Sequence, residues 1–313
     1  KYLQAAIPIC HELDDKEINL RLLAALSARA ERDGDYSRQL TECEQPRLQL
    51  AREMGDRNVE GHALMFCGQI RALYLGDLEG GLALTNEAIE AWKDVTGVLY
   101  PMLRKAQIEI ALERLNEAEA TLAHVQDITR RDFTELGRAG WTLVSAILCN
   151  RRGDVQSLGR VLELAAQVEA MVVAGTASRQ YQMAAACESA AARLGLAQRL
   201  AADGGRNADA IQTHHRQALA ASSLALDIYR DFGFVQVIEC FSEEILYRHS
   251  RALAANGKAE EADRYLTEAY DEMMRKHNLI PQGSAYRRGF LDRIHLHQEI
   301  RAAYAERFLS SER

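Results

Sequence analysis

The histidines are the first side chains whose type and spacing could do chemistry, as ligands of a metal ion. Two sets lie close in the sequence: His214 with His215, and His295 with His297. On a helix, adjacent residues point about 100° apart, and residues two positions apart point about 200° apart. Neither set converges on one ion, so we predict no metal site.

The acidic and glycine-containing stretches predict no catalytic residues and no cofactor. Gly257 and Lys258 lack the upstream glycine of a phosphate-binding loop, and Lys258 begins a predicted helix. The motifs HExxH and GxSxG are absent. The acid pair Glu260-Glu261 is typical of a solvent-exposed helix face. The sequence therefore predicts a protein that is not an enzyme.

The overall charge and hydropathy argue against two classes of partner. The 313 residues carry a formal net charge of −7, whereas a nucleic-acid-binding surface needs a basic face. No apolar run approaches the roughly 20 residues of a membrane-spanning helix. We predict neither direct nucleic-acid binding nor membrane insertion.

The cysteines show neither a close pair nor the spacing of metal ligands. Most of them lie in apolar helical stretches, where a free cysteine behaves as a small hydrophobic residue. This pattern predicts a reducing compartment, and so a cytoplasmic location. The six positions are Cys10, Cys43, Cys67, Cys149, Cys187 and Cys240.

The helices of this chain are predicted most clearly in residues 61–97. This stretch predicts two amphipathic helices joined by a tight turn. Gly76 is the predicted left-handed cap of the first helix, and Asp77 is the predicted N-cap of the second. Small side chains at Gly68 and Gly81 allow the two backbones to approach closely. A lone pair cannot bury its own apolar face, so it needs neighbouring pairs.

The same turn recurs along the chain. Its first residues are 34, 76, 113, 153 and 257, so the steps are 42, 37 and 40 residues, followed by a gap of 104 that could hold two units. The chain contains only 4 prolines, and its apolar spacing favours helix throughout. We predict an all-α helical-repeat array. Seven residues before the turns, small residues recur at Ser27, Ala106, Ala146 and Ser250, with Gly68 one position out of register.

The small residue before the turn, the Gly-Asp-apolar turn and the later ladder of Ala and Leu resemble the tetratricopeptide repeat. Steps near 40 residues resemble the longer variant in MalT-like, LuxR-type and cyclase-linked bacterial regulators. The resemblance implies a right-handed superhelical solenoid of about six antiparallel helix pairs and a C-terminal capping helix. The chain departs from the family at Pro46, which should kink its helix, and in the stretched unit at 172–233.

We expect a single domain over residues 1–313 that is a fragment of a larger protein. Residues 1–12 are predicted to be the tail of an earlier helix, and a further turn is predicted at 204–206. The predicted pairs occupy residues 16–54, 57–95, 100–129, 132–171, 177–232 and 234–277, and the predicted cap occupies 284–308.

The resemblance also implies a concave groove, lined by the first helix of each pair. In the family, ligands contact positions that are counted from the small residue before the turn, and three pairs of this chain carry suitable side chains there. Tyr, Arg and Gln at such positions suit recognition of an extended peptide or a polar ligand. The residues are His62, Met65 and Gln69, then Tyr100, Leu103 and Gln107, and finally Glu244, Tyr247 and Arg251.

Two functions follow from this interpretation. The first is a non-enzymatic sensor or protein-interaction module of a larger signalling or transcription-regulating protein, which binds a partner, or its own effector or NTPase domain, through the groove. The second is a receptor for a small-molecule inducer, as in MalT-like activators; a deep pocket with converging aromatic side chains near Trp141 or Tyr181 would favour it. An all-helical enzyme would need clustered acids or histidines that the sequence lacks.

Overall fold

The computed structural model describes residues 15–93, 96–132, 135–202 and 207–309. Across these ranges every regular element is helical, and the one β-type pairing is an isolated bridge between Val237 and Cys240. The predicted helical tail at 1–12 and the predicted turn at 204–206 fall outside the described residues. No helix in the described part of the chain is long and apolar enough to span a bilayer. The all-α class, with helices packed in adjacent pairs, is confirmed.

Contacts divide the chain into two compact units. Unit 1 comprises residues 1–112 and 276–294, and unit 2 comprises residues 113–275 and 295–313. Helix α14 (Ala259–Leu279) belongs to unit 2 up to Arg275 and to unit 1 from Lys276. The repeat pattern predicted one array and contained no sign of this division.

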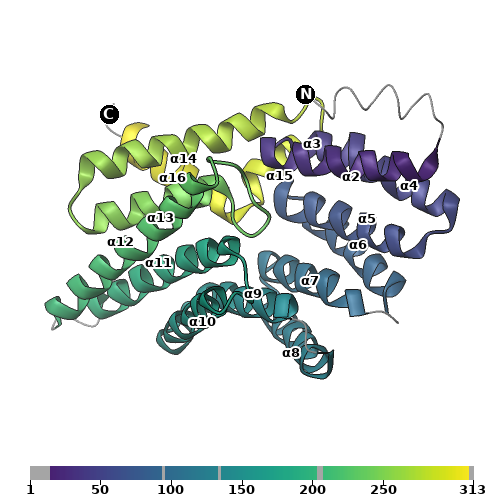
Figure 1. Cartoon of the computed structure of the whole chain (residues 1–313). Coiled ribbons are helices and arrows are strands. Elements are labelled where there is room, and N and C mark those ends of the chain that lie inside the picture. Colours follow the sequence, from purple (N-terminus) through teal and green to yellow (C-terminus); the bar gives the residue numbers. More distant parts are fainter. Residues whose placement is uncertain (1–14, 94–95, 133–134, 203–206, 310–313) are drawn as a thin grey trace. The chain divides into compact units, whose positions relative to one another are not determined.

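Unit 1 is a stack of helices that includes a short segment from the far end of the chain. In Figure 1 its helices are purple and blue, and its C-terminal segment is yellow-green. The bounds are α2 (Lys16–Asp33), α3 (Tyr36–Arg38), η1 (Gln39–Glu44), α4 (Gln45–Met54), α5 (Arg57–Gln69), η2 (Ile70–Tyr74), α6 (Leu78–Ala91), η3 (Thr96–Val98), α7 (Leu99–Ala111) and α15 (Tyr286–Asp292).

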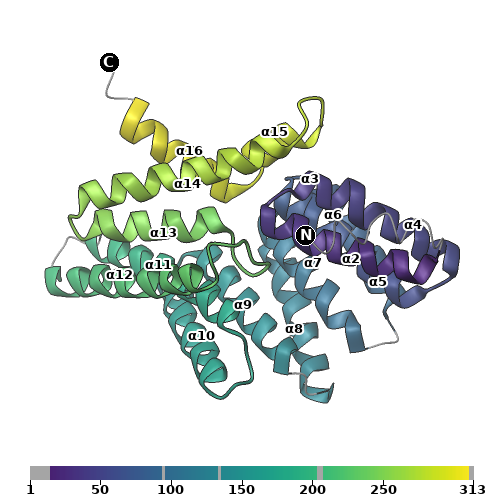
Figure 2. The ribbon, with the colours of Figure 1, turned by 45° about the horizontal axis from the view of Figure 1, so that its top comes forward.

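The turn at Gly76 forms as predicted. Gly76 has φ +76°, and the Asp77 carboxylate accepts a hydrogen bond of 3.2 Å from the Gly80 amide. The close approach of the two helices is also confirmed, since a Cβ on Gly68 would lie 2.9 Å from the carbonyl oxygen of Gly81. Helices α5 and α6 therefore meet backbone to backbone, side by side as in Figure 2.

Two π-helical turns, each with one residue more than an α-turn, adjust the register of unit 1. The turn η1 immediately precedes Pro46, and in it the Gln45 amide reaches back to the carbonyl of Leu40. It accommodates the missing N–H of Pro46 within a helix that otherwise continues to Met54. The turn η2 follows Gln69, and its extra residue explains why Gly68 is one position out of register.

Unit 2 contains the longer helices. Helices α11 and α12 share an extensive interface and run side by side in Figures 1 and 2. Helix α11 buries the small residues Ala184, Ala185 and Ala190. Besides the unit-2 part of α14, the bounds are α8 (Leu115–Asp132), α9 (Glu135–Arg152), α10 (Val155–Val173), α11 (Arg179–Ala202), α12 (Ala208–Asp231), α13 (Ser242–Ala255), α16 (His295–Tyr304) and η4 (Ala305–Leu309).

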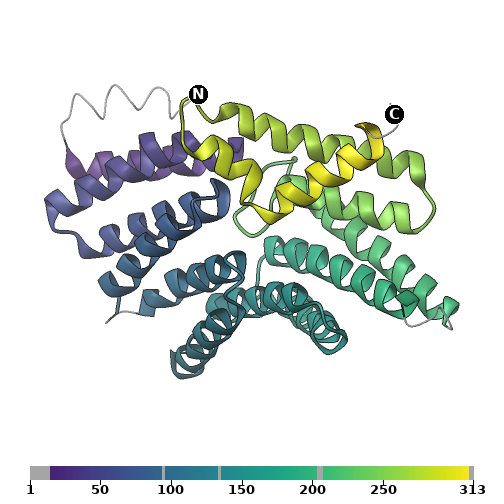
Figure 3. The same ribbon diagram turned by 180° about the vertical axis from the view of Figure 1, so that it is seen from behind.

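The expected capping helix at 284–308 is interrupted. Helix α15 ends at Asp292, and α16 begins at His295, as the yellow segment in Figure 3 shows. The two halves bury side chains in different units, which gives the physical reason for the break. Phe290 is fully buried beside His277 in unit 1, whereas His297 is fully buried beside Glu243 in unit 2.

Gly76 provides a direct test of the backbone contact inside unit 1. An added Cβ would lie 2.3 Å from the carbonyl oxygen of Gly289, a backbone atom that cannot swing away. Gly257 has nearly the same left-handed φ, +74°, but nothing lies within 4 Å of its added Cβ. We expect Gly257→Ala to lower the free energy of unfolding by about 1 kcal/mol, the cost of a left-handed Ala, and Gly76→Ala to lower it by about 2 kcal/mol or more beyond that. Urea unfolding measures both, and equal losses would contradict the contact.

Candidate functional site

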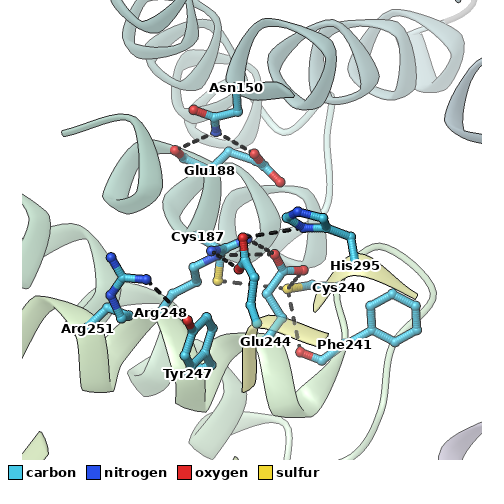
Figure 4. Close-up of polar contacts among 11 residues, drawn as sticks. Asn150, Cys187, Glu188, Cys240, Phe241, Glu244, Tyr247, Arg248, Arg251 and His295 are labelled. Carbon is cyan, nitrogen blue, oxygen red and sulfur yellow. Dashed lines mark hydrogen bonds and ion pairs between the residues drawn. The ribbon is translucent and has the colours of Figure 1, made fainter. Parts of the chain in front are cut away.

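The candidate site is a polar cluster in unit 2 around the guanidinium of Arg248. Arg248 Nη2 lies 3.1 Å from Glu244 Oε1 on the same helix, and Arg248 Nη1 lies 3.2 Å from Glu299 Oε2 on α16. His295 Nδ1 lies 3.3 Å from the other oxygen of Glu299. The side chains of Arg248 and Glu244 are 21% and 16% exposed, so the cluster is accessible to water while being fixed by its contacts (Figure 4).

A third carboxylate reaches this cluster from α11. Asn150 on α9 donates through Nδ2 to the Glu188 carboxylate at 2.5 Å and to the Glu188 backbone carbonyl at 2.9 Å. Figure 4 shows this amide on the opposite side of Glu188 from Arg248. We call the set of Asn150, Glu188, Glu244, Arg248, His295 and Glu299 the Arg248 cluster.

The Arg248 cluster has more negative than positive groups. Burial, followed by the neighbouring Glu244, raises the pKa of Glu188 to about 7, despite the opposing effect of Arg248. Burial also opposes the charge of Arg248, but Glu244, Glu299 and Glu188 outweigh it and raise the pKa of the guanidinium. Burial and Arg151 lower the pKa of His295, so its ring is neutral at pH 7. The positive charge of Arg248 thus interacts with three carboxyl groups.

Tyr247 and Arg251 extend the cluster along α13. Arg251 Nη1 donates to the Tyr247 hydroxyl at 3.1 Å. The guanidinium carbons of Arg248 and Arg251 lie 5.7 Å and 5.8 Å from the centre of the Tyr247 ring. These distances are in the range of cation–π attraction. The sequence predicted Glu244, Tyr247 and Arg251 as ligand contacts of a groove. In the structure Glu244 contacts Arg248 and Arg251 contacts Tyr247.

Two thiols lie beneath the cluster. Cys240 Sγ is 3.8 Å from Cys187 Sγ and 3.9 Å from the Glu244 carboxylate. The contact with Cys187 and then burial raise the pKa of the Cys240 thiol, so the thiolate is disfavoured. A protonated, buried thiol is a poor nucleophile, and this pair packs the interface between α11 and the start of α13.

The histidines of α16 face different carboxylates, as their spacing predicted. His295 contacts Glu299, whereas His297 Nε2 lies 3.0 Å from Glu243 Oε1. Ser242 Oγ lies 3.3 Å from the second oxygen of Glu243. In this row the carboxylate stands between serine and histidine, so the imidazole is not placed to take the serine proton as a triad requires. The side chains of Glu243 and His297 are at most 1% exposed, and the row joins α13 to α16.

The second predicted pair places its contact residues differently. Met65 and Gln69 are buried, and Gln69 Nε2 donates to the Tyr74 hydroxyl at 2.5 Å. His62 Nδ1 accepts from Arg47 at 3.0 Å, and burial followed by Arg47 lowers the His62 pKa to about 4. His62 is therefore neutral, and it packs beside Phe66 with ring centres 4.9 Å apart.

The third pair is mixed. Tyr100 is 39% exposed, whereas Leu103 is 6% exposed and belongs to the core of unit 1. Gln107 accepts a hydrogen bond of 2.7 Å from Arg104. Of the nine predicted contact residues, Met65, Gln69, Leu103 and Tyr247 are buried. Ligand contact by all nine stays a prediction.

Sequence reasoning missed Asn150, Glu188, Arg248 and Glu299. None of them occupies a family contact position, and they come from four helices that are far apart in the chain. One signal was present: Glu244 and Arg248 are four residues apart, the spacing of a helical ion pair. Nothing in the sequence indicated that Glu188 and Glu299 would join them.

The comparisons with known proteins add no family. No protein-family model matches the sequence, and no curated protein matches it significantly. The likeness to tetratricopeptide repeats therefore rests on the residues quoted above.

The raised pKa of Glu188 predicts a pH dependence of stability. Because the folded-state pKa lies above the unfolded value, the protonated carboxyl stabilises the fold below about pH 4.5, and this contribution is lost as the pH rises through about 7. Glu188→Gln cannot ionise, so the variant should gain about 1–3 kcal/mol relative to wild type between pH 5 and pH 8. Urea unfolding of both proteins at pH 5 and at pH 8 measures this gain in stability. The exposed Glu169→Gln is the control and should show no such gain; an equal gain there would contradict the assignment.

Removal of Arg248 should expose the repulsion among the carboxylates. We expect Arg248→Met to lower the free energy of unfolding by about 3 kcal/mol at pH 8, and by less at pH 5, where Glu188 takes up a proton. Arg216→Met, on an exposed face of α12 with one hydrogen bond to Thr213, should cost under about 0.5 kcal/mol at either pH. A pH-independent loss for Arg248→Met would show that the residue acts through packing alone.

Proposed function

We propose that the chain is a non-enzymatic protein-interaction module, the regulatory region of a larger signalling or transcription-regulating protein. It would bind a partner protein or its own effector domain. A right-handed, tetratricopeptide-like superhelix and a cytoplasmic location belong to the same proposal. Its support is the recurrent turn of the sequence together with helices packed in adjacent pairs.

One observation carries the proposal: the polar side chains of α13 are already held in position. Glu244, Tyr247 and Arg251 contact each other or Arg248, so little rotamer freedom remains to be lost on binding. The buried Tyr247 ring helps to hold Arg251 in place, and such preorganisation lowers the entropic cost of binding a partner. The surplus of carboxylates in the Arg248 cluster favours a partner with basic side chains.

The second candidate, a receptor for a small-molecule inducer, is favoured by a different feature of unit 2. A cavity of about 550 Å³ lies against α12, α13 and α14, within the size range of small-molecule sites. It is not where the aromatic side chains Trp141 and Tyr181 suggested. Trp141 donates to the Leu122 carbonyl at 3.0 Å and packs in the core, and Tyr181 packs beside Ala185.

Thermal unfolding in the presence of candidate ligands distinguishes these functions. A ligand that binds only the folded chain at 100 times its dissociation constant adds about 2.7 kcal/mol of stability. We expect pools of basic peptides to raise the midpoint by a few degrees, and Glu244→Gln and Arg251→Met to abolish that shift. Arg216→Met should retain it.

Two results would overturn the interaction module, and another would overturn only its assignment to the α13 surface. A shift with small metabolites and none with peptides would favour the receptor. A peptide shift that is the same in Arg251→Met and wild type would exclude the α13 surface. Turnover of a hydrolase or transferase substrate by the isolated chain would show that it is an enzyme.

A further inference from the structure

The cavity in unit 2 has an aromatic and aliphatic floor. We call it the α12–α14 groove. Its apolar lining comes from Leu226 and Tyr229 on α12, Phe234 in the following loop, Leu246 on α13 and Tyr265 on α14. The lining along α14 continues from Tyr265 to Arg275, a rise of about 15 Å at 1.5 Å per residue. An extended peptide of about five residues spans that length.

Phe234 is the unusual residue of this groove. The residue is 57% exposed, although its side chain is one of the largest apolar groups in the chain. Its φ is +59°, a left-handed conformation that disfavours a bulky side chain. The Phe234 amide donates to the Tyr229 carbonyl at 3.0 Å, and the Tyr229 hydroxyl donates to the Phe234 carbonyl at 3.1 Å. The fold therefore holds an exposed aromatic ring at the rim in a strained backbone conformation, a feature common at ligand-binding sites.

The aromatic floor is fixed in place by its neighbours. The Tyr229 and Phe234 rings meet edge to face with centres 5.3 Å apart. The Tyr265 ring meets His249 edge to face at 4.7 Å, and the guanidinium carbon of Arg264 lies 4.8 Å from its centre. Rigid aromatic surfaces bind a partner's apolar side chain at a low cost in conformational entropy.

The charges of the groove are complementary to one basic group. Arg230 pairs with Asp227 at 2.8 Å, Arg275 pairs with Glu272 at 2.7 Å, and Arg264 lies 3.8 Å from Glu268. Asp271 completes the lining acids and, among the described residues, has neither an ion pair nor a hydrogen bond through its side chain. The lining has three acids and two arginines, and Asp227 and Arg264 pair with two of these residues from outside the lining. Together they leave a charge of −1, which is that of Asp271.

We propose that the α12–α14 groove binds a short peptide segment of a partner protein that carries a large apolar side chain and, within four residues of it, a lysine or arginine. The apolar side chain lies against Phe234 and Tyr229, and the basic group pairs with Asp271. The inference rests on the proposed interaction function and names a second surface for it, separate from the residues Glu244 and Arg251.

The test uses the whole chain and defined nine-residue peptide pools labelled with fluorescein. The first pool has Trp at position 4 and Lys at position 8, with Ala, Ser, Gln and Gly randomised elsewhere. The second replaces Lys by Glu, and the third replaces Trp by Ser. Fluorescence anisotropy should show saturable binding of the first pool, at least about tenfold tighter than of either other pool.

Two variants report on the groove without threatening the fold. Phe234→Asn removes the ring and installs a residue that tolerates left-handed φ, so the unfolding midpoint should not fall while peptide affinity drops at least about tenfold. Asp271→Asn should weaken binding about threefold in low salt and less in high salt. The controls are Val173→Asn, at an apolar residue that is 84% exposed on α10, and Glu169→Gln, and both should bind as wild type does.

Several outcomes would overturn the proposal. These are absence of saturable binding up to about 1 mM protein, equal binding of the Lys and Glu pools, or unchanged affinity in Phe234→Asn. Full displacement of the peptide by an equal concentration of 2-phenylethylamine would assign the groove to small aromatic amines instead. If Arg251→Met loses peptide binding and Phe234→Asn keeps it, the groove is rejected and the interaction function is retained. If Phe234→Asn loses peptide binding and Arg251→Met keeps it, the α13 surface is rejected.

Discussion

Unit 2 depends on a shared positive charge, that of Arg248. Two carboxylates contact its guanidinium, from Glu244 and Glu299, and Glu188 adds a third charge nearby. In a stack of helix pairs each pair contacts chiefly its neighbours, so stability accumulates step by step. The Arg248 cluster is different, because it joins α11, α13 and α16, and Asn150 adds α9. Burial of a carboxylate costs free energy unless the group is paired or protonated. In this cluster Glu244 and Glu299 are paired with Arg248, and the raised pKa of Glu188 favours its protonated form.

The parts of the fold that could be predicted are those that depend on a few residues close in sequence. Gly76 was recognised as a left-handed cap because a glycine at a helix end, followed by an N-cap aspartate, is sufficient to predict it. Gly68 and Gly81 were recognised as a backbone contact because no other residue leaves that space. The contact of Gly76 with Gly289 could not be foreseen, since more than two hundred residues separate them. A pattern that repeats within pairs carries no information on which distant segment closes a unit.

The candidate site was predicted only in part, because the family's contact positions do not show which faces of a helix are buried in this chain. The π-turn at Ile70–Tyr74 explains the offset of Gly68 from the turn, but it follows His62, Met65 and Gln69 and leaves the count among them unchanged. Within a stack, a helix buries more than one face, so a contact position in an open family member can be a core position here. Met65, Gln69 and Leu103 show this outcome. On α13 the predicted Tyr247 is likewise buried, whereas the predicted Glu244 belongs to the Arg248 cluster.

Helix α13 carries one wall of the groove and the centre of the Arg248 cluster. Leu246 is two residues from both Glu244 and Arg248, so it points about 200° away from them around the helix axis. A change at one face reaches the other only if the helix moves. Ser222 Oγ lies 3.1 Å from His249 Nδ1, which holds α13 to α12, and Ser250 Oγ donates to the Ala262 carbonyl at 2.8 Å, which holds α13 to α14. These two hydrogen bonds resist movement of α13. While both are intact, protonation of Glu188 does not affect binding in the groove, and binding in the groove does not affect protonation of Glu188.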